Sequence, residues 1–182
     1  GIRDSVASRG LGDVYKRQSL ESAEYAAKMG LPLMLPGIFG PPKIFIPLVE
    51  RYREAWEENG HPTQDCQVGT IAHTFMASSS QEAFRVSAPR FKVYMEWVRD
   101  LLRLSTPALS DLIRETDLKQ MTDRGPTVCG SREEVLDKMS SYRELLGLNV
   151  YLLMCDLGGM PASELNESLL AFGSEILPEF AQ

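Results

Sequence analysis

The chain has 182 residues, of which 43% are hydrophobic and 24% are charged, and its net charge is −6. This composition is typical of one globular domain with a sizeable core, and the scattered positive residues argue against nucleic acid as a partner, since a phosphate backbone requires a basic face. No apolar run approaches the roughly 18 residues of a membrane span, and the 3 cysteines lack a CxxC pair, so we expect a cytoplasmic protein with neither a disulfide framework nor a zinc site.

The first segment, residues 1–18 ("GIRDSVASRGLGDVYKRQ"), has no sustained period of a helix or a strand. Its part "SRGLGDVYKRQ" resembles the peptide that results when sequencing-adaptor DNA is translated at the edge of an assembled read. We therefore expect residues 1–18 to be a non-native leader, which is left out of fold reasoning, and residues 19–182 to form the domain.

The next segments predict a helix, a strand and a second helix. Residues 19–29 carry alanines at helical spacing and precede Gly30, which suits the C-terminal cap of a helix. Residues 31–35 ("LPLML") are a continuous apolar run, as expected of a strand that is buried on both faces. After a Pro/Gly loop, apolar residues at spacings of three and four predict a helix over 42–59.

The rest of the chain continues this alternation. Residues 67–77 ("QVGTIAHTFMA") are rich in β-branched and aromatic residues and predict the second strand. Ser80 is expected to cap a helix that ends near residue 104, and Ser131 with Glu134 forms a capping box at the start of another helix. The other expected elements are a helix over 110–116, a third strand over 150–155 and a last helix over 162–177.

Three buried strands separated by helices predict consecutive βα units and therefore a parallel sheet, which places the chain in the α/β class. Three strands are too few to close a barrel. The pattern of strands and helices therefore indicates that the chain is part of a larger α/β fold.

The stretches "SAEYAAKMGLPLML", "GSREEVLDKMSSYRELLGLNVYLLMCDLGGMP" and "ESLLAFGSEILPEF" resemble, in this order, the C-terminal half of the luciferase-like flavin-dependent monooxygenases. The resemblance implies part of a (β/α)₈ TIM barrel, a fold that takes about 250 residues. It implies that the strands at 31–35, 68–76 and 150–155 are the sixth to eighth strands of the barrel. Residues 78–127 would then be an insertion between strands seven and eight, and strands one to five would be missing.

The resemblance also implies a binding site for the phosphate of FMN at the start of the first helix. Ser19 and Ser22 match its hydroxyl positions, and Leu20 and Glu21 would supply backbone amides. Unpaired N–H groups in the first turn of a helix attract a phosphate without a basic side chain. The residues themselves leave a second interpretation open, in which Ser19 is only the N-cap and Ser22 faces solvent. Glu21 and Glu24 would have to point away from the anion.

Four further side chains are candidates for the site or for a structural role. Leu35 and Pro36 end a strand and either line the flavin or substrate cavity or pack in the core. His73 is expected to be a structural histidine with satisfied hydrogen bonds, with catalysis as the alternative. Asp156 precedes a glycine turn and is expected to stabilise that turn. No metal site and no catalytic residue is identified.

The activity that the resemblance implies is an FMN-dependent monooxygenation of a small organic substrate, such as an aldehyde, a hydrocarbon or a sulfur compound, by reduced flavin and O₂. A partner reductase or NAD(P)H would supply the reduced flavin, and the intact parent is expected to form a homo-oligomer. We expect this chain to be inactive alone. The alternatives are a deazaflavin-dependent oxidoreductase of the same fold and a non-catalytic module that completes a barrel with another chain.

Overall fold

The computed structural model describes residues 20–38, 40–104, 106–107, 110 and 116–180. The expected leader over 1–18 and the candidate Ser19 lie outside these residues, as does most of the helix expected over 110–116.

A parallel sheet forms the centre of the molecule, and its longest strand pairs with each of the other three. Residues 68–70 of this strand pair with the first strand, residues 74–76 with the third and residues 69–73 with the fourth. The predicted α/β class with a parallel sheet is therefore confirmed. The strands are β1 (Leu33–Leu35), β2 (Val68–Met76), β3 (Val128–Gly130) and β4 (Val150–Met154).

The strand β3 corrects the prediction of three strands. It has 3 residues, all of them buried, and it lies directly before the capping box at Ser131. A run this short shows no period along the sequence, so only its pairing with the end of β2 identifies it as a strand.

Helices follow or precede each strand. Their bounds are α2 (Leu20–Lys28), α3 (Ile46–Glu58), α4 (Ser80–Leu102), α6 (Leu118–Asp123), α7 (Arg132–Leu146), α8 (Ala162–Glu175) and α9 (Leu177–Phe180), with 3₁₀ turns η2 (Pro42–Phe45) and η3 (Thr63–Asp65).

Two expected helix caps have different outcomes. The residue that caps α4 is Ser79 and not Ser80, because the Ser79 hydroxyl accepts a hydrogen bond from the backbone N–H of Glu82. The capping box of α7 is confirmed, with the Glu134 carboxylate accepting from the Ser131 N–H at 2.8 Å.

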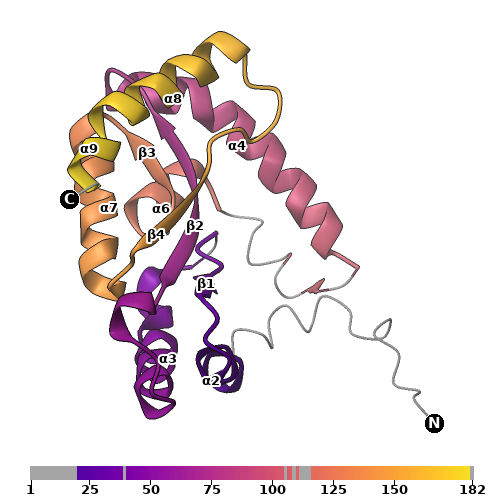
Figure 1. Ribbon diagram of the computed structural model, residues 1–182. Helices are drawn as coiled ribbons and strands as arrows, with labels where there is room; N and C mark the ends of the chain where they lie inside the picture. The colour runs from indigo at the N-terminus through magenta and orange to yellow at the C-terminus, as the bar shows by residue number, and fades with distance from the viewer. Residues whose placement is uncertain (1–19, 39, 105, 108–109, 111–115, 181–182) are drawn as a thin grey trace.

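The sheet separates two layers of helices, with α4 on one side and α7 and α8 on the other (Figure 1). Successive side chains of a strand point to opposite faces, so Ala72 and Met76 of β2 pack toward α7 and α8 while Phe75 packs against α4. A third cluster joins α2, α3 and β1.

The α4 side of the sheet is covered at one end only. At the C-terminal end of β2, the side chains of His73 and Phe75 are buried beneath α4. Toward the other end, Met34 of β1 and Leu152 of β4 are exposed. Large apolar side chains on an uncovered sheet face are unusual for a complete domain core. Among the helices that the structure describes, none is both long and apolar enough to cross a membrane.

Candidate cofactor site

The helix α2 is held close to α3 by small side chains. Ala23 and Ala27 lie one turn apart on the buried face of α2 and are almost fully shielded from solvent. Gly30, with φ +64°, ends the helix, and the N–H of Leu31 donates to the carbonyl of Ala26 at 2.9 Å, which is the Schellman pattern of a C-terminal cap. The direction of α2, and of its first turn, is therefore set by packing.

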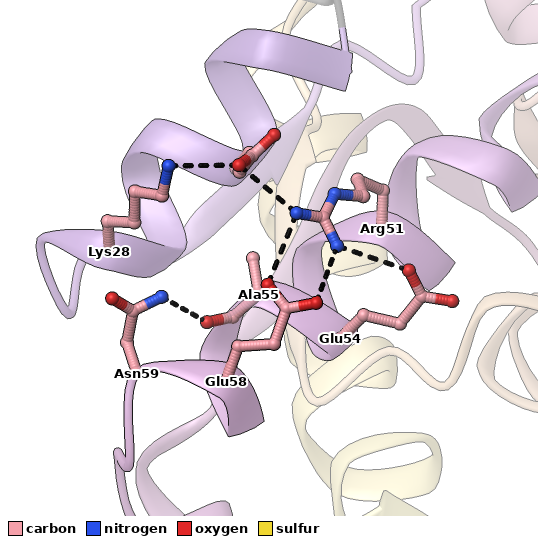
Figure 2. A network of polar contacts seen from close by, with 7 residues as sticks. Lys28, Arg51, Glu54, Ala55, Glu58 and Asn59 are labelled. Carbon is pink, nitrogen blue, oxygen red and sulfur yellow. Dashed lines mark hydrogen bonds and ion pairs between the residues drawn. The ribbon is translucent and has the colours of Figure 1, made fainter.

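A network of charged side chains adds a second link between α2 and α3 (Figure 2). The Arg51 guanidinium of α3 contacts Glu24 of α2 at 3.1 Å, and Lys28 contacts the same carboxylate at 2.9 Å. Arg51 also binds Glu54 at 3.3 Å and Glu58 at 3.1 Å on its own helix.

This network removes one objection to an anion site at the start of α2. Hydrogen bonds from Lys28 and Arg51 lower the pKa of the Glu24 carboxyl, and the same two cations balance its negative charge. We expected Glu24 to avoid a bound phosphate by pointing to solvent. Instead, its ion pairs with Lys28 and Arg51 reduce the repulsion between its carboxylate and the phosphate. Glu21 lies in the first turn of α2 and is exposed.

The predicted phosphate-site residues are described in part. Leu20 begins α2 and is exposed, and Ser22 is half-buried in the same turn. Both residues therefore lie in the first turn of α2, where the phosphate site was predicted.

Leu35 has a different environment from the other candidates. Its side chain is 1% exposed and belongs to the cluster of α2, α3 and β1, which is the core-packing alternative. The β1 side chain on the opposite, uncovered face is Met34, and its exposure contradicts the expectation that this strand is buried on both faces.

His73 lies under α4 with its ring in edge contact with two aromatic rings. The ring centroids are 5.6 Å from Phe91 and 5.0 Å from Tyr94. Burial lowers the pKa of His73 to about 4, so the imidazole is neutral at pH 7. The expectation of a satisfied histidine is wrong for the described residues, because neither ring nitrogen has a hydrogen-bond partner among them.

Asp156 stabilises the glycine turn after β4, as predicted. Its carboxylate accepts a hydrogen bond from the N–H of Gly158 at 2.8 Å. Within the described part of the chain, no group of three or more His, Cys, Asp or Glu side chains is arranged to hold a metal ion.

A groove of about 1070 Å³ lies between η2, the start of α4, α6 and α7, and the sequence analysis missed it. Lys138 and Tyr142 of α7 form part of its wall; Lys138 donates to the carbonyl of Thr122, and Tyr142 to that of Gly125. Burial lowers the pKa of Lys138. The lining comes from η2, α4 and the consecutive elements α6, β3 and α7, so no local pattern predicts the groove.

Solved structures of similar fold include two monooxygenases and a reductase. The monooxygenase RslO1 from Streptomyces bottropensis superposes with a TM-score of 0.69 at 21% identity, over 90% of this chain and 46% of that chain. The oxygenating constituent of 3,6-diketocamphane monooxygenase from Pseudomonas putida, solved with FMN, has a TM-score of 0.68 at 19% identity, over 87% and 45%. The coenzyme F420-dependent tetrahydromethanopterin reductase from Methanopyrus kandleri has a TM-score of 0.60 at 14% identity, over 90% and 49%.

Sequence comparison extends these likenesses. The uncharacterized protein YddN of Bacillus subtilis (strain 168) is 26% identical over an alignment of 146 residues, and the match covers 76% of this chain and 42% of that protein. The chain thus spans about half the length of the relatives that it matches. The family described as luciferase-like monooxygenase matches residues 18–149, which are more than half of the chain. The chain therefore belongs to the luciferase-like monooxygenase family.

Proposed function

We propose that the chain is the C-terminal part of an FMN-dependent monooxygenase that uses reduced flavin and O₂ on a small organic substrate, such as an aldehyde, a hydrocarbon or a sulfur compound. The observation that carries this proposal is the family match, which includes α2 and the strands β1 to β3. In the proposal, α2 binds the phosphate of FMN at its first turn.

The residues present at α2 fit a phosphate. The first N–H groups of a helix have no partner within the helix, and the helix dipole places partial positive charge there. Leu20 and Glu21 would supply backbone amides, and Ser22 would add a hydroxyl at a half-buried position. Packing on α3 and the Arg51 network hold this turn in place. Bound flavin would supply the redox chemistry, and α2 would orient it through the phosphate.

We further propose that the chain does not catalyse the reaction alone. It spans about half the length of its relatives, and the sheet face beside Met34 and Leu152 is uncovered. A site with one open side cannot exclude water from a reactive flavin. A partner reductase or NAD(P)H would supply the electrons in the complete system.

The phosphate site is tested by measuring the affinity of the full chain for FMN and for riboflavin, which lacks the phosphate. We expect FMN to bind more tightly than riboflavin. Ser22→Ala should weaken FMN binding about tenfold, the size of one hydrogen bond to a charged group. Ser141→Ala is the matched control, since Ser141 is an exposed serine on α7. Equal affinity for FMN and riboflavin would contradict the site.

A deazaflavin-dependent oxidoreductase is the second candidate, and it is favoured by the F420-dependent reductase among the similar structures. Such an enzyme transfers hydride and uses no O₂. Competition between FMN and the deazaflavin cofactor F420 for the full chain distinguishes the two, because the preferred cofactor displaces the other at equal concentration.

A non-catalytic module that completes a barrel with another chain is the third candidate, favoured by the uncovered sheet face. Light scattering during size-exclusion chromatography tests it. A monodisperse monomer would leave no partner to complete the barrel.

A further inference from the structure

The groove between η2, α4, α6 and α7 has the size of a site for a small organic molecule. Its volume is about 1070 Å³, close to the upper end of the range of ligand pockets. Lys138, Tyr142 and Leu145 line it from successive turns on one face of α7. Pro42 of η2 and Phe84 of α4 add apolar surface. The groove therefore combines apolar walls with a single half-buried ammonium, that of Lys138.

The Lys138 ammonium has no carboxylate as an ion-pair partner in the part of the chain that the structure describes. It donates a hydrogen bond to the carbonyl of Thr122 and lies 5.1 Å from the centre of the Tyr142 ring. Asp123 favours its charged form, but this carboxylate is ion-paired with Lys119 at 2.6 Å. An ammonium has three N–H donors, so two of them remain for a ligand in the groove.

Burial lowers the pKa of Lys138, because it removes water from the charged form. A bound anion would restore the favourable surroundings of that charge. The other charges of the groove limit how negative the anion can be, since the lining holds four Lys or Arg side chains and four Asp or Glu side chains. A phosphate dianion would meet Asp137 and Glu144, which are exposed on α7. A single negative charge needs Lys138 alone.

We propose that this groove binds an amphipathic monocarboxylate, whose carboxylate pairs with Lys138 and whose apolar body lies on Phe84 and Leu145. A hydrogen bond between an ammonium and a carboxylate is about twice as strong as one between neutral groups. The apolar walls contribute the burial of the ligand body, and Lys138 sets its orientation. The proposal does not rest on flavin binding, because the groove is lined by η2, α4, α6, β3 and α7 and the proposed phosphate site lies on α2.

Three probes with the same apolar body and different head groups test the proposal on the isolated full chain: phenylbutyrate, phenylbutanol and phenylbutylamine. Calorimetry at pH 7 should show that the carboxylate binds about tenfold more tightly than the alcohol, and that the amine binds more weakly than both. Lys138→Met keeps the length of the side chain without its charge and should abolish the preference for the carboxylate. Lys43→Met is the matched control, since Lys43 is an exposed lysine of the same groove, and it should keep that preference.

Amide NMR of the wild-type chain locates the probe, and it carries the test if Lys138→Met does not fold. Phenylbutyrate should shift the amides of Lys138, Ser141 and Phe84, which line the groove from two helices. Three results would overturn the proposal: equal affinity for the carboxylate and the alcohol, a folded Lys138→Met variant that still prefers the carboxylate, or no shift in the groove on addition of phenylbutyrate.

Discussion

His73 lies near the C-terminal end of β2, where its imidazole has lost contact with solvent and has two aromatic neighbours, Phe91 and Tyr94. The charged form is the one that burial penalises, so folding and protonation of this ring oppose each other. The other titratable groups beside it are Tyr94, Cys129 and Cys155, and burial raises the pKa of each. None of these three gains a charge in acid.

Replacing His73 by Phe should remove part of the acid sensitivity of the fold. The pKa of His73 is about 4 in the folded chain against 6.5 for the free side chain, so the unfolded chain binds the extra proton between these values. Stability therefore falls as the pH drops from 6.5 to 4, by up to about 3 kcal/mol. Urea unfolding at pH 7 and pH 4.5 should show a smaller loss for His73→Phe than for the wild type. Equal losses would contradict this role.

Gly37 is a second residue whose environment predicts a large effect. A Cβ atom at this position would lie 2.1 Å from Oγ1 of Thr70 and 2.7 Å from the carbonyl oxygen of Ile71. Gly37→Ala should lower the free energy of unfolding by about 2 kcal/mol or more, because a backbone atom cannot move away cheaply. Gly173→Ala is the control: no atom lies within 4 Å of its added Cβ, and alanine favours α8 by up to about 1 kcal/mol. Chemical denaturation measures the free energy of unfolding of both variants. An unchanged value for Gly37→Ala would contradict the close approach of Gly37 to Thr70 and Ile71.

At the scale of the elements, helix ends and helix pairs depend on a few polar contacts. The capping box of α7 satisfies two backbone N–H groups, those of Ser131 and Glu134. At the other end of α7, Arg53 of α3 donates to the carbonyls of Leu146 and Gly147 at 3.0 and 2.8 Å. Both ends of this helix are thus closed by side chains.

Ser131→Ala should destabilise the chain by about 1 kcal/mol, since it leaves the N–H of Glu134 without its cap. Ser141→Ala, in the interior of the same helix, should be neutral or slightly stabilising because alanine is the better helix former. Thermal unfolding of both variants against the wild type gives the comparison. Equal effects would show that the capping box contributes nothing specific.

Arg51→Gln should loosen α2 from α3 and weaken the salt dependence of the fold. The Arg51 side chain is partly exposed, and its ion pairs with Glu24 and Glu58 are screened by salt. The melting temperature of the wild type should therefore fall toward that of the variant as NaCl is raised. Parallel salt curves would mean that the network does not hold the helices together.

At the scale of the molecule, the long helices and strands could be predicted from the sequence. The short strand β3 and the surroundings of His73 depend on contacts between distant segments and could not. The strands β2 and β4 were found because they have 9 and 5 residues, long enough for a pattern. The strands β1 and β3 have 3 residues each; β1 lies within the apolar run of residues 31–35 and was predicted, whereas β3 lies in no such run and was not. The lack of hydrogen-bond partners at His73 could not be predicted, because the residues against its ring, Phe91 and Tyr94, come from another segment of the chain.

The uncovered sheet face predicts how the whole chain behaves with reduced flavin. With Met34 and Leu152 exposed, the chain should not protect reduced FMN from reacting with O₂ as it does in water. Oxygen uptake by reduced FMN, with a long-chain aldehyde present, should proceed at the same rate with and without the chain. Conversion of the aldehyde that requires the chain would show that it is active alone.

The central claim, that the first turn of α2 binds the phosphate of a flavin, is tested most directly by amide NMR shifts of the full chain. On addition of FMN, the amides of Leu20, Glu21 and Ser22 should shift together, and riboflavin should leave them unchanged. Shifts elsewhere in the chain with none in this turn would contradict the claim.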